Sequence, residues 1–308
     1  MNNQKLNIAL LALALIAPAA LYPVFLAKVL CFALFACAFN LLLGFVGLLS
    51  FGHAAILGTG GYITGYLMIN SGITPELAIL AGTVAGGLLG AIFGKLAVKR
   101  EGIYFAMVTL ALAQLVFFLY LQAPFTNGED GMQGVPRGEL FGLLDLSDNY
   151  TMYYFVLAIF VFGYWMINRT IHSPFGQVLK AIRDNEARAT SLGYDVNRYK
   201  WIAFIISSAL AALAGSTKTL VFQLASLTDV HWHMSGEVIL MTLVGGVGTI
   251  FGPVLGAGFI VSMQNYLSGG EMGNYIHIIM GAVFVVCVLS FRSGIVGQLI
   301  KFKRNNFS

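Results

Sequence analysis

The side chains best able to do chemistry are scattered along this sequence and form no catalytic or metal-binding pattern. His231 and His233 are two residues apart, and His53 lies far from both. No nearby cysteine completes a tetrahedral zinc site with them, so ordinary polar roles are expected. The three cysteines lie in apolar stretches, where they are expected to pack rather than to bind metal or form disulfides: Cys31, Cys37 and Cys287. The sequence predicts no metal, no cofactor and no catalytic residue.

Nucleotide hydrolysis is a second chemistry whose motif is missing. A phosphate-binding loop needs Gly-x-x-x-x-Gly-Lys-[Ser/Thr]. The Gly-Lys pair of this chain is Gly94-Lys95, but Leu89 stands where the first glycine belongs and Leu96 follows the lysine. The nucleophile elbow Gly-x-Ser-x-Gly and the metalloprotease pattern His-Glu-x-x-His do not occur either. The chain is therefore predicted not to be an enzyme.

The most polar helical pattern lies between residues 173 and 200. Ser173-Pro174 is typical of a helix start, with serine as N-cap and proline at the first position. Gly193 is well placed to end that helix. One face collects Val178, Ile182, Asn185, Ala189 and Leu192, whereas the other faces collect Lys180, Arg183, Asp184 and Arg188. The pattern predicts an amphipathic helix whose apolar stripe needs a partner, either lipid headgroups or a groove on a soluble protein.

Glycine gathers in two regions, 44–61 and 245–253, one in each half of the chain. Glycine lets helices approach closely, and Pro253 should break a helix. A pair of Gly/Pro-interrupted segments favours a transport route built from discontinuous helices; close packing of ordinary helices is the alternative. The glycines and polar side chains expected on such a route are Asn40, Gly44, Ser50, Gly60, Thr109, Glu237, Gly245, Gly246 and Gly248.

The elements that position these residues are apolar helices. Apolar residues make up 58% of the chain and charged residues 10%, against about 25% charged in soluble domains. A membrane-crossing helix needs about 20 apolar residues. Long stretches that qualify are 6–26, 27–48, 76–98, 103–123, 151–168, 201–221 and 275–291, and shorter ones are 51–70, 236–249 and 252–268. The predicted fold is all-α: a single polytopic transmembrane domain over 1–308, with about ten crossings and Gly/Pro-broken segments.

The basic residues indicate the orientation. With the N-terminus in the cytoplasm, fourteen of the 17 basic residues fall inside, and those outside are Lys28, Arg137 and Lys218. The acidic stretch 124–150 is then an external loop and 169–200 a cytoplasmic loop, with both termini cytoplasmic. The net charge of +4 belongs to these loops and implies no nucleic-acid partner. Residues 6–22 have some features of a signal peptide but are expected to be retained as the first helix.

Several blocks of the sequence resemble one known family. The cytoplasmic loop of LivM-type permeases of branched-chain amino acid ABC transporters is similar to Ser173-Pro174-Phe175-Gly176, to 181–189, to Leu192-Gly193 and to Arg198-Tyr199-Lys200. Further similar blocks are 40–44, 49–54, 102–106, 126–128 and 245–253. The resemblance runs from about residue 35 to 295 in the family's order, which makes it far more specific than any single block.

The resemblance implies a permease of the bacterial inner membrane that carries branched-chain amino acids. It implies work in the lipid bilayer with a homologous second permease, two cytoplasmic ATPase subunits and a periplasmic substrate-binding protein. The loop helix would be the coupling helix, seated in a groove of the ATPase. Its coupling residues would be Val178, Ile182, Arg183, Asp184, Asn185, Glu186, Ala187, Arg188, Leu192 and Gly193. The Glu-Ala-Ala…Gly signature of other importers fits loosely, because one residue too many precedes Gly193.

One alternative cargo stays open, and two other classes of protein are disfavoured. Urea or a short amide is the alternative cargo, carried by close relatives of the family. An ion-coupled secondary transporter is disfavoured, because the ionisable residues within the spans lie near span ends: Lys95, Lys218 and Glu237. An integral-membrane enzyme would need acids, histidines or cysteines clustered at one membrane face, and the sequence shows no such cluster.

Overall fold

The protein is mostly helical in a computed structural model that describes residues 14–19, 21–142, 144–268, 278–283, 285 and 294. Its helices are α2 (Pro23–Phe45), α3 (His53–Ser71), α4 (Pro75–Ala97), α5 (Gly102–Gln122), α6 (Asn149–His172), α7 (Pro174–Asp184), α8 (Glu186–Ser191), α9 (Val196–Phe222), α10 (Trp232–Gly245) and α11 (Gly252–Ser268). Short 3₁₀ turns are η1 (Ala17–Ala19), η2 (Pro124–Thr126), η3 (Gly128–Asp130) and η4 (Leu227–Asp229). Four two-residue strands complete the list: β1 (Met132–Gln133), β2 (Glu139–Leu140), β3 (Leu144–Asp145) and β4 (Leu224–Ala225).

Each predicted crossing from 27–48 to 252–268 corresponds to one helix. Five of these helices are long and apolar enough to cross a membrane among the described residues: α2, α4, α5, α6 and α9. The predicted boundary between residues 26 and 27 is wrong, because α2 already begins at Pro23, a residue that favours the first helical position. The stretches 6–26 and 275–291 lie partly outside the described residues, and the expected count of about ten crossings remains a prediction.

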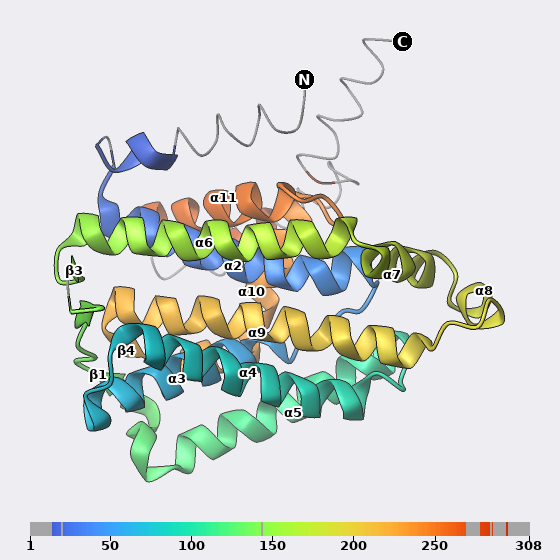
Figure 1. Ribbon diagram of the computed structural model, residues 1–308, viewed down its shortest axis with the longest axis horizontal. Coiled ribbons are helices and arrows are strands. Elements are labelled where there is room, and N and C mark those ends of the chain that lie inside the picture. Colours follow the sequence, from blue (N-terminus) through green and yellow to red (C-terminus); the bar gives the residue numbers. More distant parts are fainter. Residues whose placement is uncertain are drawn as a thin grey trace, which may run out of the picture.

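Helix α9 is the centre of the bundle and packs against α2, α3 and α4 (Figure 1). Of the 18 most apolar consecutive residues of α9, 78% are buried, whereas in α5 the corresponding share is 28%. Helices α5 and α6 lie on opposite sides of α9, where they form the outer faces of the bundle. The core of the molecule is therefore built around α9.

A stripe of glycines lets α4 approach α9 closely. Gly82, Gly86, Gly90 and Gly94 recur every four residues and so lie on one face of α4. A Cβ at Gly86 would collide with Ala212 of α9, and a Cβ at Gly82 or Gly90 would collide with serines of the same helix. This small-residue contact is typical of helices that associate within a membrane.

Helix α10 is too short to span the hydrocarbon core unless the segment before it contributes to the same crossing. It has 14 residues, about 21 Å at 1.5 Å per residue, whereas the hydrocarbon core is about 30 Å thick. The chain that leads into it enters the bundle: Val230 lies against Gly58, in the second turn of α3. The predicted crossing 236–249 thus contains a short helix, α10, which follows a segment packed into the bundle between α9 and α10.

The segment between α5 and α6 forms a compact cap at the end of the bundle away from α8 (Figure 1). Strand β1 pairs antiparallel with β4, and β2 pairs antiparallel with β3. Asp148 caps α6 by accepting a hydrogen bond from the Thr151 amide at 3.0 Å, which lowers the pKa of its carboxyl. The cap and the α7–α8 segment therefore lie at opposite ends of the long helices.

Candidate functional site

The segment that connects α6 to α9 contains two short helices. Ser173 is the N-cap of α7, its hydroxyl accepting from the Gly176 amide at 3.2 Å, and Pro174 is the first helical residue, as predicted. The expectation of one helix as far as Gly193 is wrong. Asn185 leaves the helical conformation, and its side chain caps α8 by accepting from the Arg188 amide at 2.9 Å. Asparagine competes for backbone hydrogen bonds in this way, so it favours caps over helix interiors.

The end of α8 is closed by a Schellman motif. Gly193 has φ +88°, a left-handed conformation that suits glycine. Its amide bonds the Thr190 carbonyl and the Tyr194 amide bonds the Ala189 carbonyl, which satisfies two carbonyls of the last turn. Gly193 therefore ends the second of the two helices, as its position in the sequence indicated.

The apolar stripe of this loop is divided between the interior and the surface. Ile182 and Ala189 are buried with Val196 in a small cluster inside the chain. Leu192, by contrast, is 71% exposed. The partner that most of the stripe requires is thus the start of α9, and Leu192 is the large apolar side chain of the stripe that points to solvent.

Two charged contacts hold the loop to the helix bundle. Arg183 donates from Nη1 to the Gly44 carbonyl at the end of α2, over 2.6 Å. Lys200 of α9 places its Nζ 2.6 Å from a carboxylate oxygen of Glu186 in α8. The loop is thereby fixed to α2 on one side and to α9 on the other.

The first glycine-rich break, 46–52, lies between α2 and α3, and polar side chains satisfy its backbone. The Thr109 hydroxyl accepts from the Phe51 amide at 3.1 Å. The Ser50 hydroxyl accepts from the Gly52 amide at 3.1 Å. Ser235 of α10 donates to the Phe51 carbonyl, at 2.7 Å. Irregular backbone within a membrane needs such internal partners.

The second break, 246–251, joins α10 to α11 and is held by one side chain of α2. Asn40 accepts from the Gly248 amide at 3.0 Å and donates to the Thr249 carbonyl at 2.8 Å. Gly246 and Gly248 have φ of 122° and 74°, values that disfavour any residue with a side chain. Asn40, which is 2% exposed, therefore ties the turn to the last turns of α2.

Of the remaining predicted route residues, Gly60 and Gly245 lie in close helix contacts, and Glu237 is partly accessible. A Cβ at Gly60 would collide with the Ala212 carbonyl of α9, and one at Gly245 would collide with the Gly252 carbonyl of α11. Both glycines thus permit close helix contact. Glu237, on α10, is half-buried. The structure brings Asn40, Gly44 and Gly248 into one cluster, and sets Gly60 apart from it.

An ion pair inside the bundle is the feature that sequence reasoning missed. Lys218 of α9 contacts Asp229 of η4, and both side chains are largely buried, at 15% and 8% exposure. The Lys218 ammonium also lies 5.3 Å from the centre of the Phe32 ring. Residue spacing gave no signal, because the pair exists only where the segment before α10 enters the bundle.

His53 and His231 have structural partners among the described residues. His53, fully buried, lies with Nε2 2.9 Å from the Ser207 hydroxyl, which itself donates to the Ala38 carbonyl. The histidine therefore links α3 to α9 and, through Ser207, to α2. His231 accepts from the His233 amide and caps α10.

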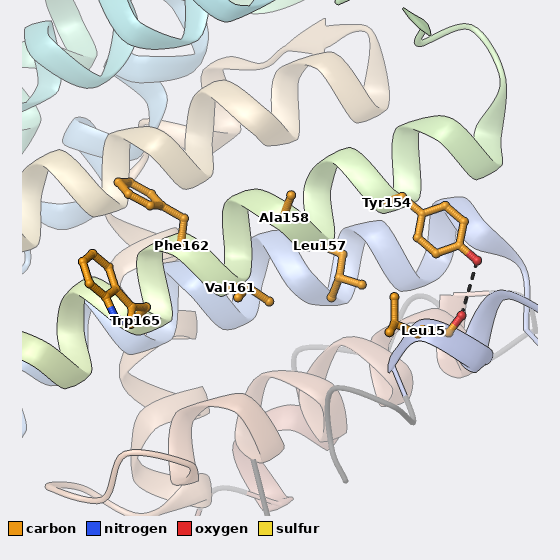
Figure 2. Close-up of a pocket in the computed structure, with 7 residues that line it drawn as sticks. All are labelled: Leu15, Tyr154, Leu157, Ala158, Val161, Phe162 and Trp165. Carbon is orange, nitrogen blue, oxygen red and sulfur yellow. Dashed lines mark hydrogen bonds between the residues drawn. The ribbon is translucent and has the colours of Figure 1, made fainter. Parts of the chain in front are cut away.

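A shallow apolar groove, open to the surface, lies on the outer face of α6. Figure 2 shows its lining: Leu15, Tyr154, Leu157, Ala158, Val161, Phe162 and Trp165. The Tyr154 hydroxyl donates to the Leu15 carbonyl at 3.3 Å along its rim. None of the predicted route residues lines this groove, so it is separate from the two glycine-rich breaks.

Known proteins similar to this chain are transport permeases. LivM of Salmonella typhimurium, a permease of a high-affinity branched-chain amino acid transport system, is 28% identical over 277 residues, which cover 81% of this chain and 64% of LivM. LsrC of Klebsiella pneumoniae, an autoinducer 2 import permease, is 30% identical over 59% of this chain and 53% of its own. RbsC of Haemophilus influenzae, a ribose import permease, is 25% identical over 70% of this chain and 66% of its own.

The chain spans just under two thirds of LivM, with 64% of that protein covered. A family model described as the permease component of branched-chain amino acid transport systems matches residues 23–288. That match takes in every helix from α2 to α11, both glycine-rich breaks and the loop that Arg183 and Glu186 fix to the bundle. This chain therefore belongs to the branched-chain amino acid transport permease family.

Proposed function

We propose that this chain is the membrane-spanning subunit of an ATP-driven importer that moves branched-chain amino acids across a bacterial inner membrane. The family match over residues 23–288 carries the proposal, and the LivM relative supports the cargo. The ribose and autoinducer 2 permeases among its relatives make a sugar-like solute the second candidate cargo. The proposed topology has ten crossings with both termini in the cytoplasm, an arrangement that follows from the distribution of basic residues.

The proposed complex contains a homologous second permease, two cytoplasmic ATPases and a periplasmic binding protein. ATP hydrolysis belongs to the ATPase subunits, since this sequence carries no phosphate-binding loop. Purification from native membranes in a mild detergent tests this division of labour. We expect a second permease and an ATPase with Gly-x-x-x-x-Gly-Lys-[Ser/Thr]. A pure, active transporter without any ATPase would contradict it.

The proposed docking surface for the ATPase is the solvent face of α7 and α8, centred on Leu192. Its 71% exposure leaves an apolar side chain at the surface of a polar loop. In a docked groove Leu192→Asp would bury an unpaired charge, which costs several kcal/mol. Leu192→Asp should release the ATPase without loss of the permease from the membrane. Leu144→Asp is the matched control, because Leu144 is 54% exposed in the cap at the opposite end.

Ile182 serves as a contrast in the same experiment. Its side chain is 2% exposed within the chain's own cluster. Ile182→Asp should therefore lower the stability of the permease itself, whether or not an ATPase is present. ATPase binding that survives Leu192→Asp would show that the docking surface lies elsewhere.

The proposed cargo route passes between the two glycine-rich breaks. Asn40, Ser50 and Thr109 hold the backbone of these breaks, so backbone groups and Glu237 are the proposed contacts for the cargo's ammonium and carboxylate. Glu237→Gln should lower uptake and leave the affinity of the binding protein unchanged. Glu139→Gln, in strand β2 of the cap, is the matched control. Equal uptake in both variants would remove Glu237 from the route.

A further inference from the structure

Arg183 connects two parts of the molecule that are far apart in sequence. Its Nη1 donates to the Gly44 carbonyl at 2.6 Å, while its Nε and Nη2 donate to Asp184 at 3.2 and 2.9 Å. The last carbonyls of a helix have no partner within the helix, and a cationic side chain is a strong donor to them. The guanidinium thus joins the end of α7 to the end of α2.

The carbonyl that Arg183 contacts belongs to a residue packed directly on the second break. A Cβ at Gly44 would lie 2.6 Å from the Gly248 amide nitrogen, too close for any side chain. Arg183 also reaches this point, because its Nη1 would lie 3.6 Å from a Cβ at Gly248. Arg183, Gly44 and Gly248 therefore meet at one place, between the cytoplasmic loop and the α10–α11 turn.

The same face of α2 also contacts the α10–α11 turn through Asn40, one helical turn before Gly44. Asn40 lies four residues before Gly44 and makes two hydrogen bonds to the turn, with the Gly248 amide and the Thr249 carbonyl. Gly246 and Gly248, with positive φ, place backbone freedom on both sides of Val247. Closely packed parts of a protein move as units rather than deform continuously, so a shift of α2 is carried into this turn.

We propose that Arg183 is a positioning residue that makes the α10–α11 turn follow movements of α7, by way of Gly44 and Asn40. This inference rests on the proposed function, in which an ATPase displaces α7 and α8. In this proposal the α10–α11 turn is the part of the cargo route that moves, and the Arg183 guanidinium is the contact that transmits the movement of α7. A structural cap of α2 is the competing role for Arg183.

The test uses the full reconstituted complex with Arg183→Met, which keeps an unbranched apolar stem but removes the guanidinium and its donors. We expect uptake per ATP hydrolysed to fall about tenfold, within the usual range of coupling between sites. The amount of permease in the membrane should stay unchanged. Arg183→Lys should restore part of the ratio, because an ammonium can still donate to the Gly44 carbonyl. Arg198→Met, an exposed arginine in the first turn of α9, is the matched control.

A second measurement reads the turn itself. Val247 is 39% exposed, so Val247→Cys reports on the turn through its rate of thiol labelling. We expect ATP-state trapping to change that rate in the parent chain and not in the Arg183→Met background. If ATP-state trapping changes the labelling rate equally in the Arg183→Met background, the inference is overturned. Loss of both Arg183 variants from the membrane would also overturn it, because it would show that Arg183 is a structural cap of α2. The labelling needs no cargo. A complex that imports nothing would therefore contradict the proposed function, while the labelling would still test the role of Arg183.

Discussion

Lys200 of α9 and Glu186 of α8 form an ion pair at 2.6 Å in which the lysine is buried and the glutamate is not: their side chains are 3% and 35% exposed. The pair closes the small helix α8 onto the start of α9. Because one partner is shielded from water and the other is partly hydrated, the two ends of this contact should respond differently to mutation.

We expect Glu186→Ala to be more damaging than Lys200→Met. Removal of Glu186 leaves a buried ammonium without a counter-charge, and breaking a buried pair costs about 3 kcal/mol or more. Removal of Lys200 leaves a carboxylate that water reaches, so the loss should be about 1 kcal/mol. Thermal unfolding of the purified permease in detergent gives both values. Equal losses would show that the ammonium is hydrated in solution.

The pair between Lys218 and Asp229 predicts the opposite order of damage. Asp229→Asn leaves an ammonium 5.3 Å from the centre of the Phe32 ring, a cation–π contact that compensates in part. Lys218→Met leaves a buried carboxylate without compensation, at a cost of about 3–5 kcal/mol. The folded fraction after detergent extraction should rank Asp229→Asn above Lys218→Met. The double variant should recover part of the loss, and a double variant worse than both singles would contradict this account.

Neighbouring glycines of α4 test the close contact with α9. Gly86→Ala would push a methyl group into Ala212, and overpacking costs about 1–3 kcal/mol. Gly87→Ala meets only Ala209 at 3.5 Å, an ordinary contact, and gains helix propensity of up to about 1 kcal/mol. Thermal stability should fall for the first variant and hold or rise for the second. Parallel changes in both would mean that α4 and α9 are further apart.

Labelling of single cysteines tests the proposed orientation. Asp130→Cys and Asp145→Cys, in the cap, should react with an impermeant thiol reagent from outside the cell. Arg188→Cys on α8 and Lys303→Cys, which lies outside the described residues, should react only after permeabilisation. The physical basis is the excess of basic residues in cytoplasmic loops. Labelling of Arg188→Cys in intact cells would reverse the orientation.

Local signals predicted much of the fold. Hydropathy located the helices α2 to α6 and α9 to α11, and Ser173, Pro174 and Gly193 marked helix ends because caps and left-handed glycines act over a few residues. The four-residue spacing of Gly82, Gly86, Gly90 and Gly94 gave no prediction, because its partner on α9 is evident only in the structure.

Tertiary contacts decided the rest. The break at Asn185 divides a run with good helical periodicity, and it is favoured because Glu186 reaches Lys200 while Arg183 reaches Gly44. The short α10 follows a segment that enters the bundle around the Lys218–Asp229 pair. These contacts join residues at least 11 positions apart in sequence, so no local pattern announces them.

The most direct test of the central claim is uptake of radiolabelled leucine into proteoliposomes that contain the complete complex, its binding protein and internal ATP. The account predicts leucine accumulation that requires ATP hydrolysis, competes with isoleucine and valine, and is unaffected by excess ribose or urea. Accumulation of ribose or urea in place of leucine would contradict the proposed cargo. Leucine accumulation without ATP would contradict the proposed mechanism.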